Sequence, residues 1–245
     1  MITLHTYGPY FGSPDASPFV MKGEMLLKIA GIPYETSTRG FSRAPKGKLP
    51  YIKDGDEIIA DTTLIRLHIE KKYGFDFDRG LSERDQGIAW NVEKMLEDHL
   101  YWILVYWRWM IDENFDRGPR HFFDRAPAIM RPLVCAMVRR KVRANLHAHG
   151  MGRHSDVEKS ALADRGVRAL SQVLGSNQYL MGDRVCGADA TAFAFIASGL
   201  PDVFVSPLQK KLAATPNLVA YHDRMMAEFF PGFVKRGESS GVSPP

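Results

Sequence analysis

Cysteine is scarce in this sequence. The 245 residues include two cysteines, Cys135 and Cys186, and no Cys-x-x-Cys pair. A disulfide-stapled secreted scaffold and a cysteine-based zinc module both need more cysteines than this. Both classes are therefore excluded, and a reducing compartment such as the cytoplasm is the expected location.

Long apolar runs and targeting signals are lacking as well. The segment Met1–Gly8 has no basic stretch followed by an apolar one, so no secretory signal is expected. The longest apolar run, Tyr101–Trp107, is far shorter than the roughly 20 residues needed to cross a bilayer. The sequence predicts a cytoplasmic protein without a membrane span.

The excess of positive charge is small. The formal net charge is +4 and the isoelectric point is about 9.0. The densest basic cluster is formed by Arg139, Arg140, Lys141 and Arg143. A solvated helix surface accounts for such a cluster, and a nucleic-acid-binding module usually carries more charge. We expect no nucleic-acid partner.

Histidines offer no obvious metal site. His147, His149 and His154 lie close together in the sequence, but they lack the matching acidic or cysteine ligand that a metal ion requires. Histidines placed near a helix end account for this spacing. We expect no bound metal.

Strand and helix signals alternate over the first 78 residues. The composition, 45% hydrophobic and 24% charged, is that of a globular protein, and the length fits one large domain or two small ones. A strand–helix–strand unit forms a right-handed parallel pair, and a following hairpin makes the sheet mixed. We predict a thioredoxin-like α/β domain over residues 1–78 with a mixed four-stranded sheet. Its strands are expected at 3–7, 34–38, 49–53 and 57–60, and its helices at 17–31 and 61–73.

From Leu81 onward the signals are helical. Ser82 with Asp85 resembles a capping box and opens a long helix to about Phe115. Further helices are expected at 127–149, 155–175, 188–200 and 216–229. We predict an all-helical bundle domain over residues 81–238, followed by a loose tail over residues 239–245.

Four short segments resemble the glutathione transferase superfamily. They are Ser17–Phe19, Gly47–Ile52, Ile59–Thr62 and Gly182–Asp189, and their order and spacing match along nearly the whole chain. The stretch Ser17–Glu35 also resembles the bacterial branch related to metaxin and failed-axon-connections proteins. The resemblance implies a glutathione-binding first domain, a homodimer and a role in detoxification.

One position departs from the family pattern. Cys186 stands three residues before Asp189, where the family usually has a Ser or Thr that caps the buried helix. A thiol is a weaker hydrogen-bond acceptor than a hydroxyl, so we expect a less rigid start to that helix.

A glutathione transferase has to hold its co-substrate as a thiolate. A free thiol, with a pKa of about 8.5, is mostly protonated at neutral pH, and a helix N-terminus with a hydroxyl donor favours the anion. The resemblance implies that Ser17 supplies this hydroxyl. The alternative is that Ser17 merely caps its helix, and Tyr7 and Tyr10 are rival donors.

The resemblance also implies a set of residues that hold the rest of the tripeptide. Pro50 would be a cis-proline, and the backbone of Leu49 would pair with the cysteinyl residue. Lys48 would reach the glycyl carboxylate, Asp61 the ligand's amino group, and Thr62 the γ-glutamyl carboxylate. The alternatives are a solvated Lys48 and simple helix capping at Asp61 and Thr62.

An aromatic stripe marks the first long helix of the second domain. Trp102, Tyr106 and Trp109 recur at positions i, i+4 and i+7 and share one face. Core packing between helices is one reading. In the resembled family this helix borders the electrophile pocket, so the stripe is a predicted pocket wall.

The sequence thus predicts a glutathione S-transferase that transfers its thiol to a small apolar electrophile. Two alternatives stay open: a non-catalytic binding or adaptor protein with the same fold, and a glutathione-dependent isomerase or dehalogenase. Fold alone does not decide between them.

Overall fold

The protein was analysed as a computed structural model, which describes residues 1–124 and 126–233. Its only sheet in these residues has the order β2-β1-β3-β4, with β1 parallel to β2 and antiparallel to β3. The sheet is mixed and four-stranded, as the sequence predicted. The strands are β1 (Ile2–His5), β2 (Tyr34–Ser37), β3 (Tyr51–Asp54) and β4 (Glu57–Ala60).

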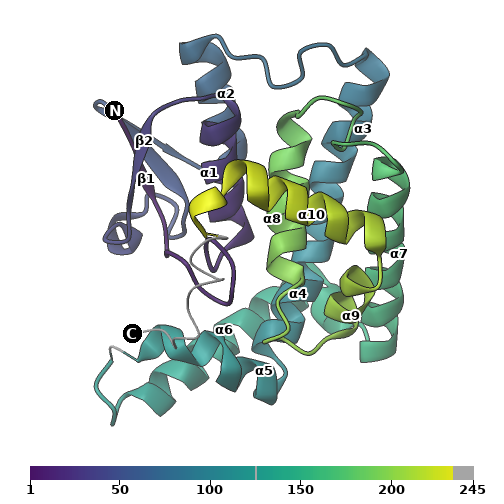
Figure 1. The fold of residues 1–245 in the computed structure, drawn as a ribbon. Helices are drawn as coiled ribbons and strands as arrows, with labels where there is room; N and C mark the ends of the chain where they lie inside the picture. Colours follow the sequence, from purple (N-terminus) through teal and green to yellow (C-terminus); the bar gives the residue numbers. More distant parts are fainter. Residues whose placement is uncertain (125, 234–245) are drawn as a thin grey trace.

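Two helices belong to the first domain: one joins β1 to β2, and the other follows β4. α1 (Pro18–Ile29) begins with Ser17 as N-cap and a proline at its first position, a favourable pair because proline lacks the N–H that would be unpaired there. α2 (Thr62–Tyr73) ends at Gly74, whose φ of 66° is left-handed. Both helices lie between the sheet and the helical bundle (Figure 1).

After Ala60 the described residues belong to no strand, so the predicted fold class is confirmed: a thioredoxin-like domain followed by a helical domain. The exact domain bounds stay a prediction, and the tail over residues 239–245 lies outside the described residues. The helices of the second part are α3 (Glu83–Lys94), the π-helix η2 (Met95–Leu100), α4 (Tyr101–Trp109), α5 (Asp112–Arg117), α6 (Arg131–His149), α7 (Asp156–Leu174), α8 (Gly187–Gly199), α9 (Pro207–Ala213) and α10 (Pro216–Phe229). Short 3-10 helices occupy Phe41–Arg43 (η1), Pro119–Phe123 (η3) and Met151–Arg153 (η4).

The prediction of one helix from Ser82 to Phe115 was wrong. The segment divides into α3, η2, α4 and α5, and a break at Met110–Ile111 separates the last two. The helix expected from Pro127 begins at Arg131, since residues 128–130 form a turn. Local capping signals identified where the helical region starts but not where it bends.

α8 is the central element of the helical domain, and every residue in it is buried. Its start is fixed by Asp189, whose carboxylate accepts hydrogen bonds from the backbone N–H groups of Leu180 and Cys186 and from the Tyr221 hydroxyl, each at 2.8 Å. The Asp189 carboxylate thus fixes the start of α8, and the lower rigidity expected from a thiol at Cys186 stays a prediction.

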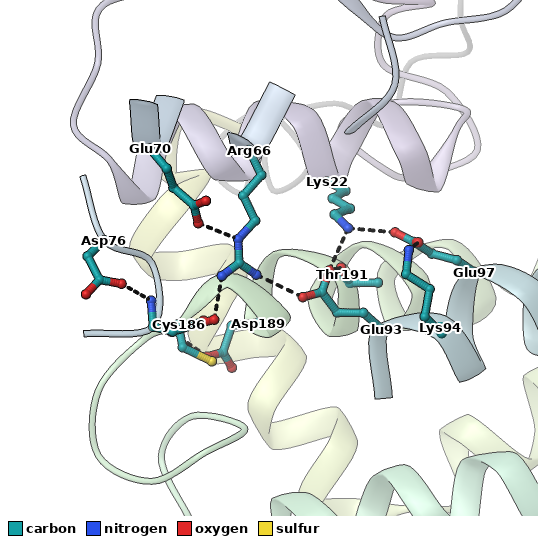
Figure 2. A network of polar contacts seen from close by, with 11 residues as sticks. Lys22, Arg66, Glu70, Asp76, Glu93, Lys94, Glu97, Cys186, Asp189 and Thr191 are labelled. Carbon is teal, nitrogen blue, oxygen red and sulfur yellow. Dashed lines mark hydrogen bonds and ion pairs between the residues drawn. The ribbon is translucent and has the colours of Figure 1, made fainter. Parts of the chain in front are cut away.

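Charged side chains lie in the boundary between the two parts (Figure 2). Lys22 of α1 is 1% exposed, and its ammonium lies 2.7 Å from Glu93 of α3 and 2.6 Å from Glu97 of η2. Arg66 of α2 contacts the other Glu93 oxygen at 3.0 Å, and the Thr191 hydroxyl of α8 donates to Glu93. These bonds join α1 and α2 to the bundle.

Replacing Lys22 by methionine should destabilise the protein strongly. Lys22→Met leaves Glu93 and Glu97 buried without their ammonium partner, a loss of about 3–5 kcal/mol for a buried ion pair. Urea denaturation measures the free energy of unfolding. Lys71→Met, at an exposed position of α2, is the matched control and should change it by less than about 0.5 kcal/mol. Equal losses in both variants would show that Lys22 contributes no more to the free energy of unfolding than an exposed lysine does.

Candidate functional site

A small buried cluster brings three chain segments together at one end of the sheet. Val20, Leu49, Tyr51 and Ala60 pack against one another. They belong to the first turn of α1, the segment entering β3, and the last position of β4. The starts of α1 and α2 and the Leu49–Pro50 edge therefore lie around one point, as the predicted glutathione site requires.

The Leu49–Pro50 peptide bond is cis, which confirms that prediction. Pro50 packs against α1 at Gly23, where an added Cβ would lie 3.3 Å from the proline ring. Both Leu49 and Pro50 are buried, whereas Lys48 is exposed. The β1–β3 register, which pairs His5 with Tyr51, places Tyr7 beside Leu49 when it is extended by two residues.

Ser17 caps α1 and keeps a free hydroxyl proton. Its Oγ accepts from the Val20 N–H at 3.4 Å, which is long for a hydrogen bond. A hydroxyl that accepts one bond can still donate another. The capping and the thiolate-binding readings of Ser17 are therefore compatible, because they use different sides of the same oxygen.

The sequence reading missed Asp15. Its carboxylate is 2% exposed and accepts three backbone N–H bonds, from Tyr7 at 3.0 Å, Gly8 at 2.7 Å and Ser17 at 2.9 Å. Burial raises the pKa of Asp15 to about 7, against the lowering effect of these amides. Asp15 ties the end of β1 to the helix cap. An aspartate two residues before a capping serine is a weak signal, since it reads as an ordinary loop residue.

The two rival tyrosines lie in different surroundings. Burial raises the pKa of Tyr7 to about 12, although the Leu49 backbone N–H beside its hydroxyl lowers it. Tyr7 is therefore protonated at neutral pH and able to donate. Tyr10 packs edge-on against Phe11 with ring centroids 4.5 Å apart, and also contacts Phe122. Its pKa is raised by burial and by Asp124.

Asp61 and Thr62 form the start of α2. The Asp61 carboxylate accepts from the Thr63 N–H at 2.9 Å, and its φ of 97° is unusual for a residue with a side chain. Strained backbone of this kind gathers at ligand sites. Thr62 is 3% exposed, and its hydroxyl makes no hydrogen bond to the described residues. Capping is thus observed for Asp61, and the ligand roles stay predictions.

The predicted aromatic stripe divides between two environments. Trp102 stacks on His149 at 4.6 Å, and the Tyr106 hydroxyl donates to Asp156 at 2.6 Å, so both pack against the helical domain around α6 and α7. Trp109 instead contacts Phe115 and Phe122. The structure does not bring Trp102 or Tyr106 into contact with the residues around Ser17. Their role as an electrophile pocket stays a prediction.

An open cavity of about 1010 Å³ is lined by the loop between β1 and α1 and by residues at and after the end of α8. Tyr10 and Phe11 of that loop form one wall, and Ala197 and Leu200 at the end of α8 form another. Phe11, with a φ of 57°, also contacts Phe204 at 4.8 Å. The same cavity is also lined by polar and charged side chains, namely Ser13, Arg117, His121, Asp124, Asp202 and His222. Apolar walls with polar groups among them suit a small organic ligand. The sequence reading missed Phe11 because no periodic pattern surrounds it.

The structure offers no cluster of three metal-binding side chains within residues 1–124 and 126–233. In the same residues none of the helices combines the length and the apolar character that a membrane crossing requires.

The stability of the protein should depend on pH through Asp15. Its folded-state pKa of about 7 lies above the ordinary 3.8, so its contribution to stability is complete below about pH 3.8 and is lost as the pH rises toward 7. Asp15→Asn removes this titration. The free energy of unfolding of the wild type should fall relative to Asp15→Asn by up to about 1.4 kcal/mol per pH unit in this window. Urea denaturation between pH 4.5 and 7.5 measures both; parallel profiles would contradict the assignment.

Two family models match the chain. The glutathione S-transferase N-terminal domain matches residues 18–114, and the glutathione S-transferase C-terminal domain matches residues 163–225.

Solved structures of glutathione transferases have the same fold as this chain. The chain is similar to glutathione S-transferase III in its apo form, with a TM-score of 0.59, 18% identity and coverage of 100% of this chain and 99% of the other. A glutathione transferase family member from Pseudomonas fluorescens with two glutathione bound has a TM-score of 0.58, 17% identity and coverage of 96% and 91%.

The curated relatives of this chain carry several different protein names. The chain is 29% identical to "Failed axon connections" of Drosophila melanogaster over 89% of its length, but spans 55% of that protein. It is 29% identical to Metaxin-1 of Macaca fascicularis over 77% of its length, spanning 62% of that protein. It is 30% identical to isoprene-epoxide–glutathione S-transferase of Rhodococcus sp. (strain AD45), covering 94% of this chain and 99% of that one. With both domain models matched and this relative aligned end to end, the chain belongs to the glutathione S-transferase family.

Proposed function

We propose that this protein is an enzyme that binds glutathione, activates its thiol and transfers it to a small apolar electrophile. The observation that carries the proposal is the meeting of three features around Val20, Leu49, Tyr51 and Ala60. These are the N-terminus of α1, the cis Leu49–Pro50 edge and the strained Asp61 at the start of α2. Each suits a different part of a peptide thiol.

The thiol would lie at the start of α1. The helix N-terminus carries a partial positive charge, and Ser17 keeps a hydroxyl proton to donate, so both favour a thiolate over a thiol. Tyr7 is a second donor on the same side, since its hydroxyl lies beside the Leu49 N–H. The proton leaves to solvent as the thiolate forms. The thiolate sulfur then bonds to an electrophilic carbon while the bond from that carbon to its leaving atom breaks; the leaving atom takes the electron pair and, where it is an epoxide oxygen, a proton from solvent.

The charged ends of the tripeptide would lie on α2 and on the loop before β3. The buried Thr62 hydroxyl and the N-terminus of α2 suit the γ-glutamyl carboxylate, and the exposed Asp61 carboxylate suits the neighbouring amino group. Lys48 is exposed and suits the glycyl carboxylate. The solved relative from Pseudomonas fluorescens holds glutathione, which supports this choice of co-substrate.

The electrophile would lie against the loop between β1 and α1. Tyr10 and Phe11 of that loop line the open cavity, and Phe122 and Trp109 extend the aromatic surface. The aromatic side chains of this wall suit an apolar electrophile, while Arg117, His121 and Asp124 are charged or polar residues of the same cavity. The relative from Rhodococcus is named for an isoprene epoxide, a small electrophile of this kind.

An adaptor without turnover is the second candidate. The observation in its favour is that the Ser17 oxygen already serves as the cap of α1, a purely structural use. Two relatives carry the names failed axon connections and metaxin, which name no transferase activity. An adaptor needs no thiolate, so the ionisation of bound glutathione separates the two functions.

Glutathione binding should depend on Asp61 and Thr62. Asp61→Ala and Thr62→Ala each remove a group that would bind a charged end of glutathione. A hydrogen bond to a charged group contributes about 1.5–3 kcal/mol, so the affinity for glutathione should fall about tenfold or more in each variant. Isothermal titration with glutathione measures it. Thr63→Ala is the control, because Thr63 uses only its backbone N–H at Asp61. Unchanged affinity in both variants, with the fold intact, would place the tripeptide elsewhere.

The pKa of bound glutathione should identify the activating group. If Ser17 donates to the thiolate, Ser17→Ala raises that pKa by roughly one to two units, and activity recovers as the pH rises. Loss of the cap alone lowers stability by about 1 kcal/mol and leaves the thiol unchanged. Thiolate absorbance and thermal unfolding measured on one variant separate these outcomes. A shift in Tyr7→Phe or Tyr10→Phe but not in Ser17→Ala would assign the role to a tyrosine.

A cytoplasmic homodimer is the assembly we propose. Ile58 of β4 and Leu64 and Leu67 of α2 are exposed apolar side chains on two elements that contact each other, and Trp90 of α3 is exposed as well. Exposed apolar side chains of this kind favour burial against a second copy. Sedimentation velocity at micromolar concentration should show a dimer, and Leu67→Glu should shift it to the monomer. A monomeric wild type would contradict this.

A further inference from the structure

The positive charge of this protein is concentrated in one segment. Residues 125–155 carry seven Lys and Arg side chains and no Asp or Glu, whereas the rest of the chain has 25 basic against 28 acidic residues. The net charge of +4 therefore comes from this segment alone. Its main element is α6, which runs for about 28 Å.

α6 is barely covered by the rest of the protein. Of its 19 residues, Leu146 is the one that is fully buried. The helix contacts α4, η3 and η4 and lies at the lower edge of the molecule in Figure 1, outside the bundle of α3, α7, α8 and α10. A helix of a globular protein normally buries a broad apolar stripe. The free face of α6 is therefore unusually large.

Apolar side chains occupy the first half of that free face. Ile129, just before the helix, is 90% exposed, and Leu133 and Met137, one turn apart, are 63% and 61% exposed. Their exposure to water costs free energy unless something covers them.

The second half of the same face carries cationic side chains that have no described carboxylate partner. Arg140 and Lys141 lie seven and eight residues after Leu133 and thus on its side of the helix, and Arg143 flanks them. All three are exposed, and no described carboxylate lies within 4.0 Å of them. Arg139 differs: it is bound to the carbonyls of Trp109 and Met110 and to Asp112. Arg139 thus fixes α6 on α4 and leaves its neighbours free.

The combination of apolar and basic side chains on this face of α6 indicates which kind of partner binds it. A second copy of α6 would bring like charges together, which opposes self-association. A nucleic acid would satisfy the cations but would leave Ile129, Leu133 and Met137 in water. An anionic lipid surface satisfies both halves, because basic side chains bind headgroups while apolar ones enter the boundary of the acyl chains.

We propose that the free face of α6, formed by Ile129, Leu133, Met137, Arg140, Lys141 and Arg143, docks the protein on an anionic lipid bilayer. The helix lies along the surface with its apolar half inserted and its basic half on the headgroups. The proposal is independent of glutathione turnover, because none of these residues belongs to the site around Ser17.

Co-sedimentation with vesicles tests the docking. The full chain should bind vesicles of phosphatidylcholine containing about 30% phosphatidylserine, should not bind phosphatidylcholine alone, and should be released by high salt. Each cation contributes about fivefold to such binding, so the triple variant R140E/K141E/R143E should bind at least about 100-fold more weakly. The control K53E/K71E/R79E makes the same change in net charge at exposed positions elsewhere and should retain most of the binding.

A second variant separates lipid from other anions. L133Q/M137Q keeps every charge and should lower vesicle binding by about tenfold or more, since two inserted side chains are lost, while its binding to heparin stays unchanged. Equal binding to neutral and anionic vesicles, no vesicle binding at all, equal losses in the control triple variant, or an unaffected L133Q/M137Q would each overturn the proposal. Thermal unfolding of every variant, expected to match the wild type, shows that the fold is kept.

Discussion

The buried ammonium of Lys22 is the contact on which the arrangement of this molecule depends. It lies in α1, the helix that Ser17 caps, and it binds two carboxylates from α3 and η2. Burial alone would raise the pKa of Glu93, and the Lys22 and Arg66 cations hold it below its ordinary value. Charges removed from water in this way are tolerable only when every partner is present. The two parts of the chain can therefore dock in one orientation, and the start of α1 is fixed relative to the helical domain.

The loop between β1 and α1 is held from both domains, which explains why it can form the wall of a site. Asp15 holds it from within, through the backbone of Tyr7, Gly8 and Ser17. From the helical side, the buried Arg108 of α4 donates to the carbonyls of Ala16 and Ser198. A loop anchored this way holds both Ser17, at the start of α1, and the aromatic side chains of Tyr10 and Phe11 in fixed positions. Preorganised donors of this kind cost no rearrangement when charge develops on a ligand.

Features with local causes could be predicted from the sequence, and those with long-range causes could not. The start of α1 at Ser17–Pro18 and the capping box at Ser155 depend on neighbouring residues, and both are present. The spacing of Trp102, Tyr106 and Trp109 correctly indicates a shared helix, but periodicity does not say which neighbour a face meets. Asp15 and Lys22 were missed for the same reason. The partners of Lys22 lie 71 and 75 residues away, and those of Asp15 are backbone amides that no side-chain pattern reveals.

The charged side chains of this protein divide by whether the fold itself supplies their partners. Lys22, Arg66 and Arg139 are each bound by carboxylates or carbonyls of the same chain, so removing them would leave unpaired groups behind. Arg140, Lys141 and Arg143 have no such bonds to the described residues, and the fold would lose little without them. Selection for folding stability alone gives no reason to gather cations beside exposed Leu133 and Met137, since like charges on one helix repel. A surface that the fold does not need, and that costs it free energy, is explained by a partner outside the chain.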